Sequence, residues 1–240
     1  MARNVEDCAL FPDAMTGEDI RDAVSLLKPG TSFLSAARSG WRPARIGFSA
    51  DLGITPVDCE VAELCRNAAY RFSEIDAVVE DALFDCSEAH DTFKVLRAKG
   101  FALGKKALLE QHRSQLKPEV IWNIEKSLAL TMDDVVRAET QRVALYRRSL
   151  AFFAEWDILC TPATIVLPFP VENRYVESCN GIPFDSYVHW LAIAYAITLV
   201  SCPAISIPCG FTSKGLPFGL QSVAWQRGRR GLAPARREGA

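Results

Sequence analysis

The 240-residue sequence contains no apolar run of the roughly 18 residues that a membrane-spanning helix requires. Its first 20 residues carry Glu6, Asp7 and Asp13, and they lack the basic start and apolar core of a secretory signal. Neither sign of charge is in large excess, because 27 Lys and Arg against 29 Asp and Glu leave a net charge of −2. We therefore predict a cytoplasmic protein with no membrane partner and no nucleic-acid partner.

Metal-binding and classical hydrolase motifs are also missing. The eight cysteines form no Cys-x-x-Cys pair and the three histidines do not cluster near them, so we expect no metal and no cofactor. Most of the cysteines are predicted to be small buried hydrophobic residues. No Gly-x-Ser-x-Gly motif indicates a serine–histidine–aspartate triad. We interpret His189 as a hydrogen-bonded structural histidine, and an enzyme with Cys160 or Cys202 as nucleophile is kept as an alternative.

What the sequence does contain is typical of one globular α/β domain. Hydrophobic residues make up 49% and charged residues 23%, and we find no internal repeat or linker. Strands are predicted at 45–49 and 77–80, on either side of a helix that Asp58 caps and that runs to about Phe72. This β-α-β order predicts a parallel crossover.

The remaining segments follow from caps, turn residues and apolar spacing. Asn4 predicts the cap of a first helix, Pro118 the first turn of a helix, and Thr131 the cap of the next helix. A turn at 212–214 separates the last two strands, which we expect to form a hairpin. The predicted elements are helices over 1–15, 31–39, 118–130, 131–155 and 184–200, strands at 158–161, 203–208 (buried) and 216–223, and a long loop over 162–183.

Four segments have specific residues that point to one protein family, beyond what their hydrophobic periodicity indicates. The end of the chain reads Cys-Pro-Ala-Ile-Ser-Ile-Pro-Cys-Gly-Phe at 202–211 and Gly-Leu-Pro-Phe-Gly-Leu-Gln at 215–221, which resembles the C-terminal hallmark of the amidase signature family. Trp-Asp-Ile-Leu-Cys-Thr-Pro-Ala-Thr at 156–164 resembles that family's D-x-L-x-T-P-x-T strand and turn. Residues 1–7 are similar to the segment that follows its catalytic signature, and 45–58 to a strand and helix start. The resemblance covers residues 1 to about 224.

This resemblance implies an α/β fold, namely the C-terminal portion of an amidase-signature α/β/α sandwich with a mixed sheet and with its central N-terminal strands missing. Residues 1–224 would be the C-terminal part of a single amidase domain. Residues 225–240 form an irregular basic tail, and we hypothesise a frameshift near Ala224. Missing strands would leave apolar sheet edges and helix faces uncovered.

Members of the family cleave or transfer carboxamide C–N bonds with a serine nucleophile, a second serine on a cis peptide and a lysine base. In the family, these residues precede the segment that matches residues 1–4. This sequence has no Gly-Gly-Ser-Ser-Gly-like run, so no residue is assigned a catalytic role. The resemblance therefore implies an amidase by descent, truncated and inactive alone. The alternative is a non-catalytic scaffold or binding chain that complements a separate N-terminal half. The partner could also be a second copy of this chain in a homo-oligomer.

The resemblance extends to three predicted substrate-binding residues. Arg142 matches a position where the A-type subunits of tRNA-dependent glutamine amidotransferases hold the substrate carboxylate, although a solvated helix face is the alternative. Those subunits place an acid near the position of Leu191, where this sequence has Trp190 and Leu191. The departure favours a more apolar pocket and a small-molecule aryl or alkyl amide as substrate.

Overall fold

The computed structural model describes residues 1–225 and divides the chain into two compact units, Met1–Pro43 and Ala44–Ala240. The predicted basic tail and the frameshift hypothesis lie outside the described residues, apart from Trp225. Among the described residues, no helix is both long and apolar enough to cross a membrane.

The first unit contains two helices, α1 (Val5–Met15) and α2 (Phe33–Ala37), as predicted. The side chain of Asn4 accepts a hydrogen bond from the Asp7 backbone N–H at 2.8 Å and caps α1. The Asp7 carboxylate pairs with Arg3 at 3.0 Å. Asp13 in α1 accepts hydrogen bonds from two backbone N–H groups at the start of α2, which fixes the two helices against each other.

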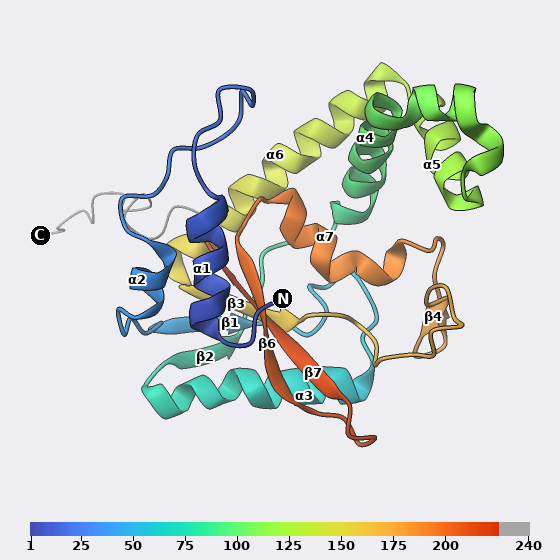
Figure 1. Cartoon of the computed structure of the whole chain (residues 1–240). Helices are drawn as coiled ribbons and strands as arrows, with labels where there is room; N and C mark the ends of the chain where they lie inside the picture. Colours follow the sequence, from blue (N-terminus) through green and yellow to red (C-terminus); the bar gives the residue numbers. More distant parts are fainter. Residues whose placement is uncertain (226–240) are drawn as a thin grey trace, which may run out of the picture. The chain divides into compact units, whose positions relative to one another are not determined.

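The second unit is built on a five-stranded mixed sheet with the strand order β2-β1-β3-β7-β6 (Figure 1). Parallel pairing joins β1 to β2 and β3, whereas β7 runs antiparallel to both β3 and β6. The strands are β1 (Arg45–Phe48), β2 (Val78–Asp81), β3 (Ile158–Pro162), β6 (Ala204–Phe211) and β7 (Pro217–Ala224). The predicted parallel crossover and the closing hairpin are both present.

Helices cover the sheet and extend beyond it. The crossover helix α3 (Cys59–Tyr70) begins where Asp58 accepts hydrogen bonds from two backbone N–H groups of its first turn, as predicted. The helices α4 (Ala89–His112) and α5 (Pro118–Leu128) pack together, and α6 (Met132–Glu155) returns from them to the sheet. Thr131 and Asp134 form a full reciprocal capping box at the start of α6. Short 3₁₀ turns follow α3 and α4, at η1 (Arg71–Ile75) and η2 (Arg113–Gln115).

The segment before the last hairpin differs from its prediction. The loop after β3 contains a short ladder of β4 (Ser178–Cys179) and β5 (Ile182–Pro183). The helix expected over 184–200 is shorter, because α7 (Ala192–Leu199) begins after a 3₁₀ turn, η3 (His189–Leu191). The Ser186 carbonyl accepts a hydrogen bond from the His189 backbone N–H at 3.1 Å and forms a turn, so residues 184–188 are not helical.

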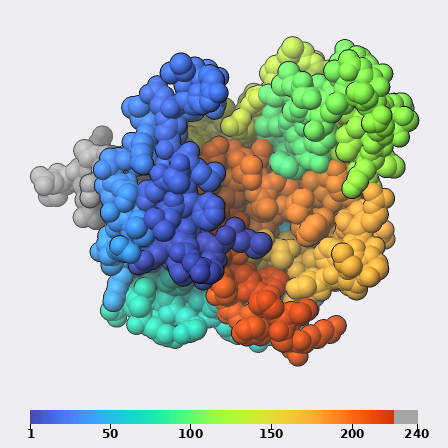
Figure 2. Space-filling view, in the orientation of Figure 1, coloured from blue at the N-terminus to red at the C-terminus, as the bar shows by residue number. Residues whose placement is uncertain are grey.

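The larger of two hydrophobic core clusters in the described part of the chain lies between the sheet and the helices α3, α6 and α7. Its fully buried side chains include Ile46, Phe48, Leu159, Phe153 and Val200. By contrast, β6 was predicted to be buried and is mostly exposed. This strand is the last in the sheet, and Figure 2 shows residues of the β6–β7 hairpin on the viewed surface. The sheet therefore ends in an open edge.

Candidate functional site

The two motifs at 156–164 and 215–221 lie side by side, because β3 pairs with β7. The Gln221 side-chain amide donates a hydrogen bond to Thr161 Oγ1 at 3.0 Å, and Thr161 is fully buried. The backbone N–H of Ala163 donates to the carbonyl of Gly219 at 3.0 Å. These contacts lock the two motifs into one rigid frame.

Gly219 leaves room in this frame for the side chain of Ser206. A Cβ atom added there would collide with Ser206 Oγ on β6 and would lie 3.5 Å from Ala163 Cβ. The absence of a side chain thus lets β6 approach the turn that follows β3.

A hollow of about 250 Å³ opens where the two motifs end. Its lining comes from the turn and loop after β3, from the start of β7, and from Trp190 in η3. The rings of Phe169 and Trp190 meet edge to face with centroids 5.8 Å apart. The hydroxyl of Thr164 is buried and has no hydrogen-bond partner among the described residues. The hollow thus has apolar walls, with Thr164 as its one hydroxyl-bearing lining residue.

The structure separates the three predicted substrate-binding residues. Trp190 lines the hollow, whereas Leu191 next to it is 39% exposed and is not part of the lining. Arg142 on α6 donates from Nε to the carbonyl of Leu199 at 3.3 Å, and its Nη1 lies 3.6 Å from Glu139 Oε2. Since Leu199 ends α7, Arg142 contacts the opposite end of that helix, roughly 13 Å along its axis from Trp190. The substrate-binding role of all three residues stays a prediction.

A polar cluster that no sequence motif indicated lies at the other end of α7. His90 on α4 is hydrogen-bonded through Nε2 to the Ile54 carbonyl at 2.7 Å and through Nδ1 to the Tyr195 hydroxyl. His189 Nδ1 lies 3.2 Å from Asp185 Oδ1, and the two histidine rings have centroids 4.4 Å apart. Burial lowers the pKa of His90, so this imidazole is neutral at pH 7.

This cluster agrees with the structural role predicted for His189. Its members come from four segments, and Ile54 and Tyr195 at the two extremes are more than a hundred residues apart, which explains why sequence spacing does not reveal them. His189 Nε2 is buried and has no hydrogen-bond partner among residues 1–225. The contacts attach the start of α4 to η3 and α7, and thereby hold Trp190 at the hollow.

Neither Cys160 nor Cys202, the two cysteines considered as nucleophiles, lies in a surrounding that favours a thiolate. Burial raises the pKa of both Cys160 and Cys202 to about 11, so these side chains are thiols at neutral pH. This environment argues against the alternative of a cysteine enzyme. In the part of the chain that the structure describes, no group of three or more His, Cys, Asp or Glu side chains could hold a metal ion.

Comparisons with known proteins match nearly the whole chain. The family model described as Amidase matches residues 1–228. An acylamidase of Rhodococcus erythropolis is 29% identical over 230 residues, which cover 95% of this chain and 48% of that protein. The A-type subunit of the glutamyl-tRNA(Gln) amidotransferase of Moorella thermoacetica is 28% identical over 247 residues. The match covers 93% of this chain and 49% of that protein.

The fold agrees with these matches. The crystal structure of a bacterial aryl acylamidase of the amidase signature family superposes with a TM-score of 0.81 at 24% identity, over 92% of this chain and 48% of that chain. The chain spans about half the length of the curated relatives it matches. The α/β fold predicted from the motifs is confirmed by the mixed sheet, by its superposition on the aryl acylamidase and by the family match over residues 1–228. The chain therefore belongs to the amidase signature family.

Proposed function

We propose that this chain forms one half of a hydrolase that cleaves the C–N bond of a small aryl or alkyl carboxamide. The observation that carries the proposal is the hollow at the ends of the two family motifs, with Trp190 as an apolar wall and the Thr164 hydroxyl as a polar group. An apolar hollow with few polar groups suits a small apolar ligand. The similarity to an acylamidase supports the same substrate class.

The catalytic serines and lysine are proposed to come from a segment outside residues 1–240, so that this chain alone is inactive. The sequence contains no Gly-Gly-Ser-Ser-Gly-like run, and the hollow is lined by apolar side chains apart from the Thr164 hydroxyl and the Trp190 indole N–H. Without a nucleophile and a base, this lining orients an amide and does not cleave it.

The open edge of the sheet supports a second half that binds here. An edge strand presents unpaired backbone N–H and C=O groups that can pair with another strand. Beside β6, a groove of about 580 Å³ runs between the end of α3 with η1 and the hairpin. Its apolar lining includes Phe72, Ile75 and Phe211, and Phe211 is 69% exposed. We propose that strands of the N-terminal half cover this edge, in a cytoplasmic protein.

Sequencing the DNA on both sides of the reading frame is the first test. An upstream DNA sequence that encodes a lysine and a Gly-Ser-Ser-Gly run, in frame or shifted by one base, would identify the missing half. Unrelated upstream DNA would leave the non-catalytic scaffold or binding chain as the better explanation.

Reconstitution is the second test. We expect no hydrolysis of a chromogenic nitroanilide by this chain alone, and hydrolysis after co-expression with the N-terminal half. In the active complex, Trp190→Ala should raise KM, whereas Trp41→Ala at an exposed tryptophan should not. A complex that binds the anilide without cleaving it would favour the scaffold alternative, and a sharp reversible melt of the isolated monomer would contradict its need for a second half.

A further inference from the structure

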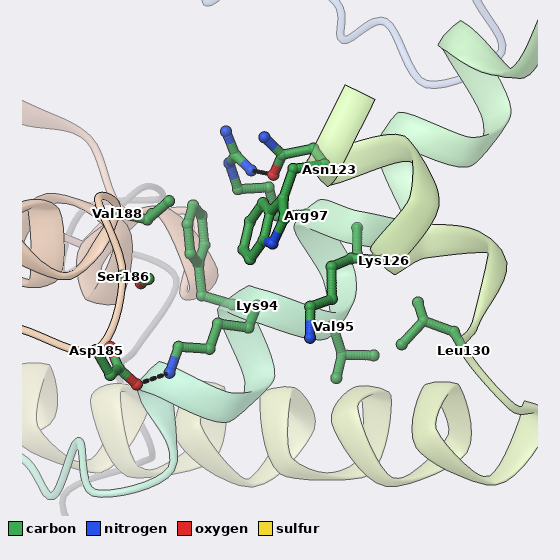
Figure 3. A pocket seen from close by; sticks show the side chains of 12 residues that line it. Lys94, Val95, Arg97, Asn123, Lys126, Leu130, Asp185, Ser186 and Val188 are labelled. Carbon is green, nitrogen blue, oxygen red and sulfur yellow. Dashed lines mark hydrogen bonds and ion pairs between the residues drawn. The ribbon is translucent and has the colours of Figure 1, made fainter. Parts of the chain in front are cut away.

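A second cavity lies between α4, α5 and the segment that precedes η3 (Figure 3). Its volume is about 340 Å³, which falls within the range of small-molecule sites. The walls are largely apolar and include Phe93, Trp122 and Val188. An apolar cavity of this size has room for an aromatic ring or a branched aliphatic group.

Positive charge in this cavity exceeds negative charge. Lys94, Arg97 and Lys126 line it together with one carboxylate, Asp185. Lys94 Nζ lies 2.5 Å from Asp185 Oδ2, so this pair is neutralised, as the dashed line in Figure 3 shows. The other two cations therefore determine the charge that a ligand meets.

Neither of these two cations has a carboxylate partner in the described part of the chain. Arg97 donates hydrogen bonds to the side-chain oxygen of Asn123 and to the hydroxyl of Tyr187, the latter at 2.9 Å, and both partners are neutral. Lys126 has one described contact, with its Nζ 5.8 Å from the centroid of the Trp122 ring. Figure 3 shows Lys126 reaching from α5 toward α4.

The residue Arg97 is half-buried, and a partly desolvated cation is stabilised by an anion. The hydroxyl of Ser186, another lining residue, is buried with no hydrogen-bond partner among the described residues. Arg97 and Lys126 are therefore the cations that a ligand meets in a largely apolar cavity, beside the neutralised Lys94–Asp185 pair.

We propose that this cavity binds a small carboxylate with an aromatic or branched aliphatic body, with Arg97 and Lys126 holding the carboxylate and Trp122 and Phe93 contacting the body. This goes beyond the proposed amide hydrolysis and does not depend on it. The apolar walls favour such a ligand over inorganic phosphate, which has no apolar part.

Isothermal titration calorimetry of the full chain, alone or with its second half bound, tests this site with 3-phenylpropanoate. The methyl ketone 4-phenyl-2-butanone, acetate and inorganic phosphate are the comparison ligands. The ketone keeps the shape and removes the charge, acetate keeps the charge and removes the ring, and neither the ketone nor the acid is an amide. We expect saturable binding of 3-phenylpropanoate and clearly weaker binding of the other three.

The variant Lys126→Gln should weaken 3-phenylpropanoate binding by about tenfold, the usual effect of losing one charge-assisted contact. Lys117→Gln is the matched control, because Lys117 is an exposed lysine at the start of the same helix and does not line the cavity. It should leave affinity unchanged, and circular dichroism should show both variants folded. Equal affinity for the acid and the ketone, no loss in Lys126→Gln, or no saturation at millimolar acid would overturn the proposal.

Discussion

Gly47, in the interior strand β1, occupies a position with no room for a side chain. A Cβ atom there would lie 2.8 Å from Phe152 Cζ, 3.1 Å from the Ala82 carbonyl oxygen and 3.2 Å from Ala82 Cβ. Phe152 is part of the core and Ala82 O belongs to the backbone, so neither moves without disturbing its neighbours. We expect Gly47→Ala to lower the free energy of unfolding by about 2 kcal/mol, within the range for overpacked cores.

The measurement is urea denaturation followed by tryptophan fluorescence, on the same soluble form of the chain for every variant. Gly100→Ala is the control with the opposite sign, because Gly100 lies inside α4 with no atom near its missing Cβ. It should stabilise the chain by about 0.5–1 kcal/mol through helix propensity.

A double-mutant cycle tests the proposed cause. Leucine lacks the Cζ atom that meets the new methyl group, so Phe152→Leu should relieve part of the clash. The double variant should therefore lose less stability than the sum of the two single variants, by more than the ~0.5 kcal/mol within which independent sites add. A neutral Gly47→Ala, or additive effects of the two changes, would refute this explanation of the glycine.

Three further predictions concern other elements. Asp157→Ala should cost about 1–3 kcal/mol, because its carboxylate accepts hydrogen bonds from two backbone N–H groups at the start of β1, at 2.8 and 3.0 Å; a urea midpoint equal to that of the unchanged chain would contradict this. Iodoacetamide at pH 7.5 should label the exposed Cys59 well before the buried Cys160, whose pKa of about 11 leaves it protonated, and mass spectrometry should find Cys160 labelling rising only toward that pH. Hydrogen bonds from Thr131 and Arg137 lower the pKa of Asp134 to about 2. The ionised Asp134 therefore contributes its full stabilisation above the ordinary carboxyl pKa of about 4, and this stabilisation is lost as the pH falls through about 2. Thr131→Ala should raise the pKa of Asp134 in an NMR titration and lower the Tm, and an unchanged titration would count against the capping box.

Local interactions explain why many elements could be predicted from the sequence. Asp58, Pro118 and Thr131 each act within three residues of a helix start, and all three occur where the pattern placed them. The strand pattern around the crossover was equally local, since the β-α-β order gives a connection long enough for parallel pairing. Helix 184–200 was only partly correct, because the turn formed by Ser186 and His189 overrides the apolar pattern.

Local sequence patterns predicted only part of the candidate site. The motif resemblance indicated Trp190 as an apolar wall, and the structure places it at the hollow formed by the two motifs. It could not show that Arg142 contacts the far end of α7, because a helix residue's neighbours depend on how other helices pack against it. The same holds for the histidine cluster and for the cavity around Arg97, whose members come from separate helices and a loop.

By itself, the sequence determined the family, most of the strands, several helix starts, and the lack of a serine–lysine catalytic motif within 240 residues, because all of these depend on residues close together in the chain. The tertiary structure alone decided that β6 is an exposed edge strand, that Gly47 must be small, and that Arg97 and Lys126 share a cavity without a carboxylate partner among the described residues. Burial and charge balance are properties of surfaces that meet only after folding, so no pattern along the chain records them.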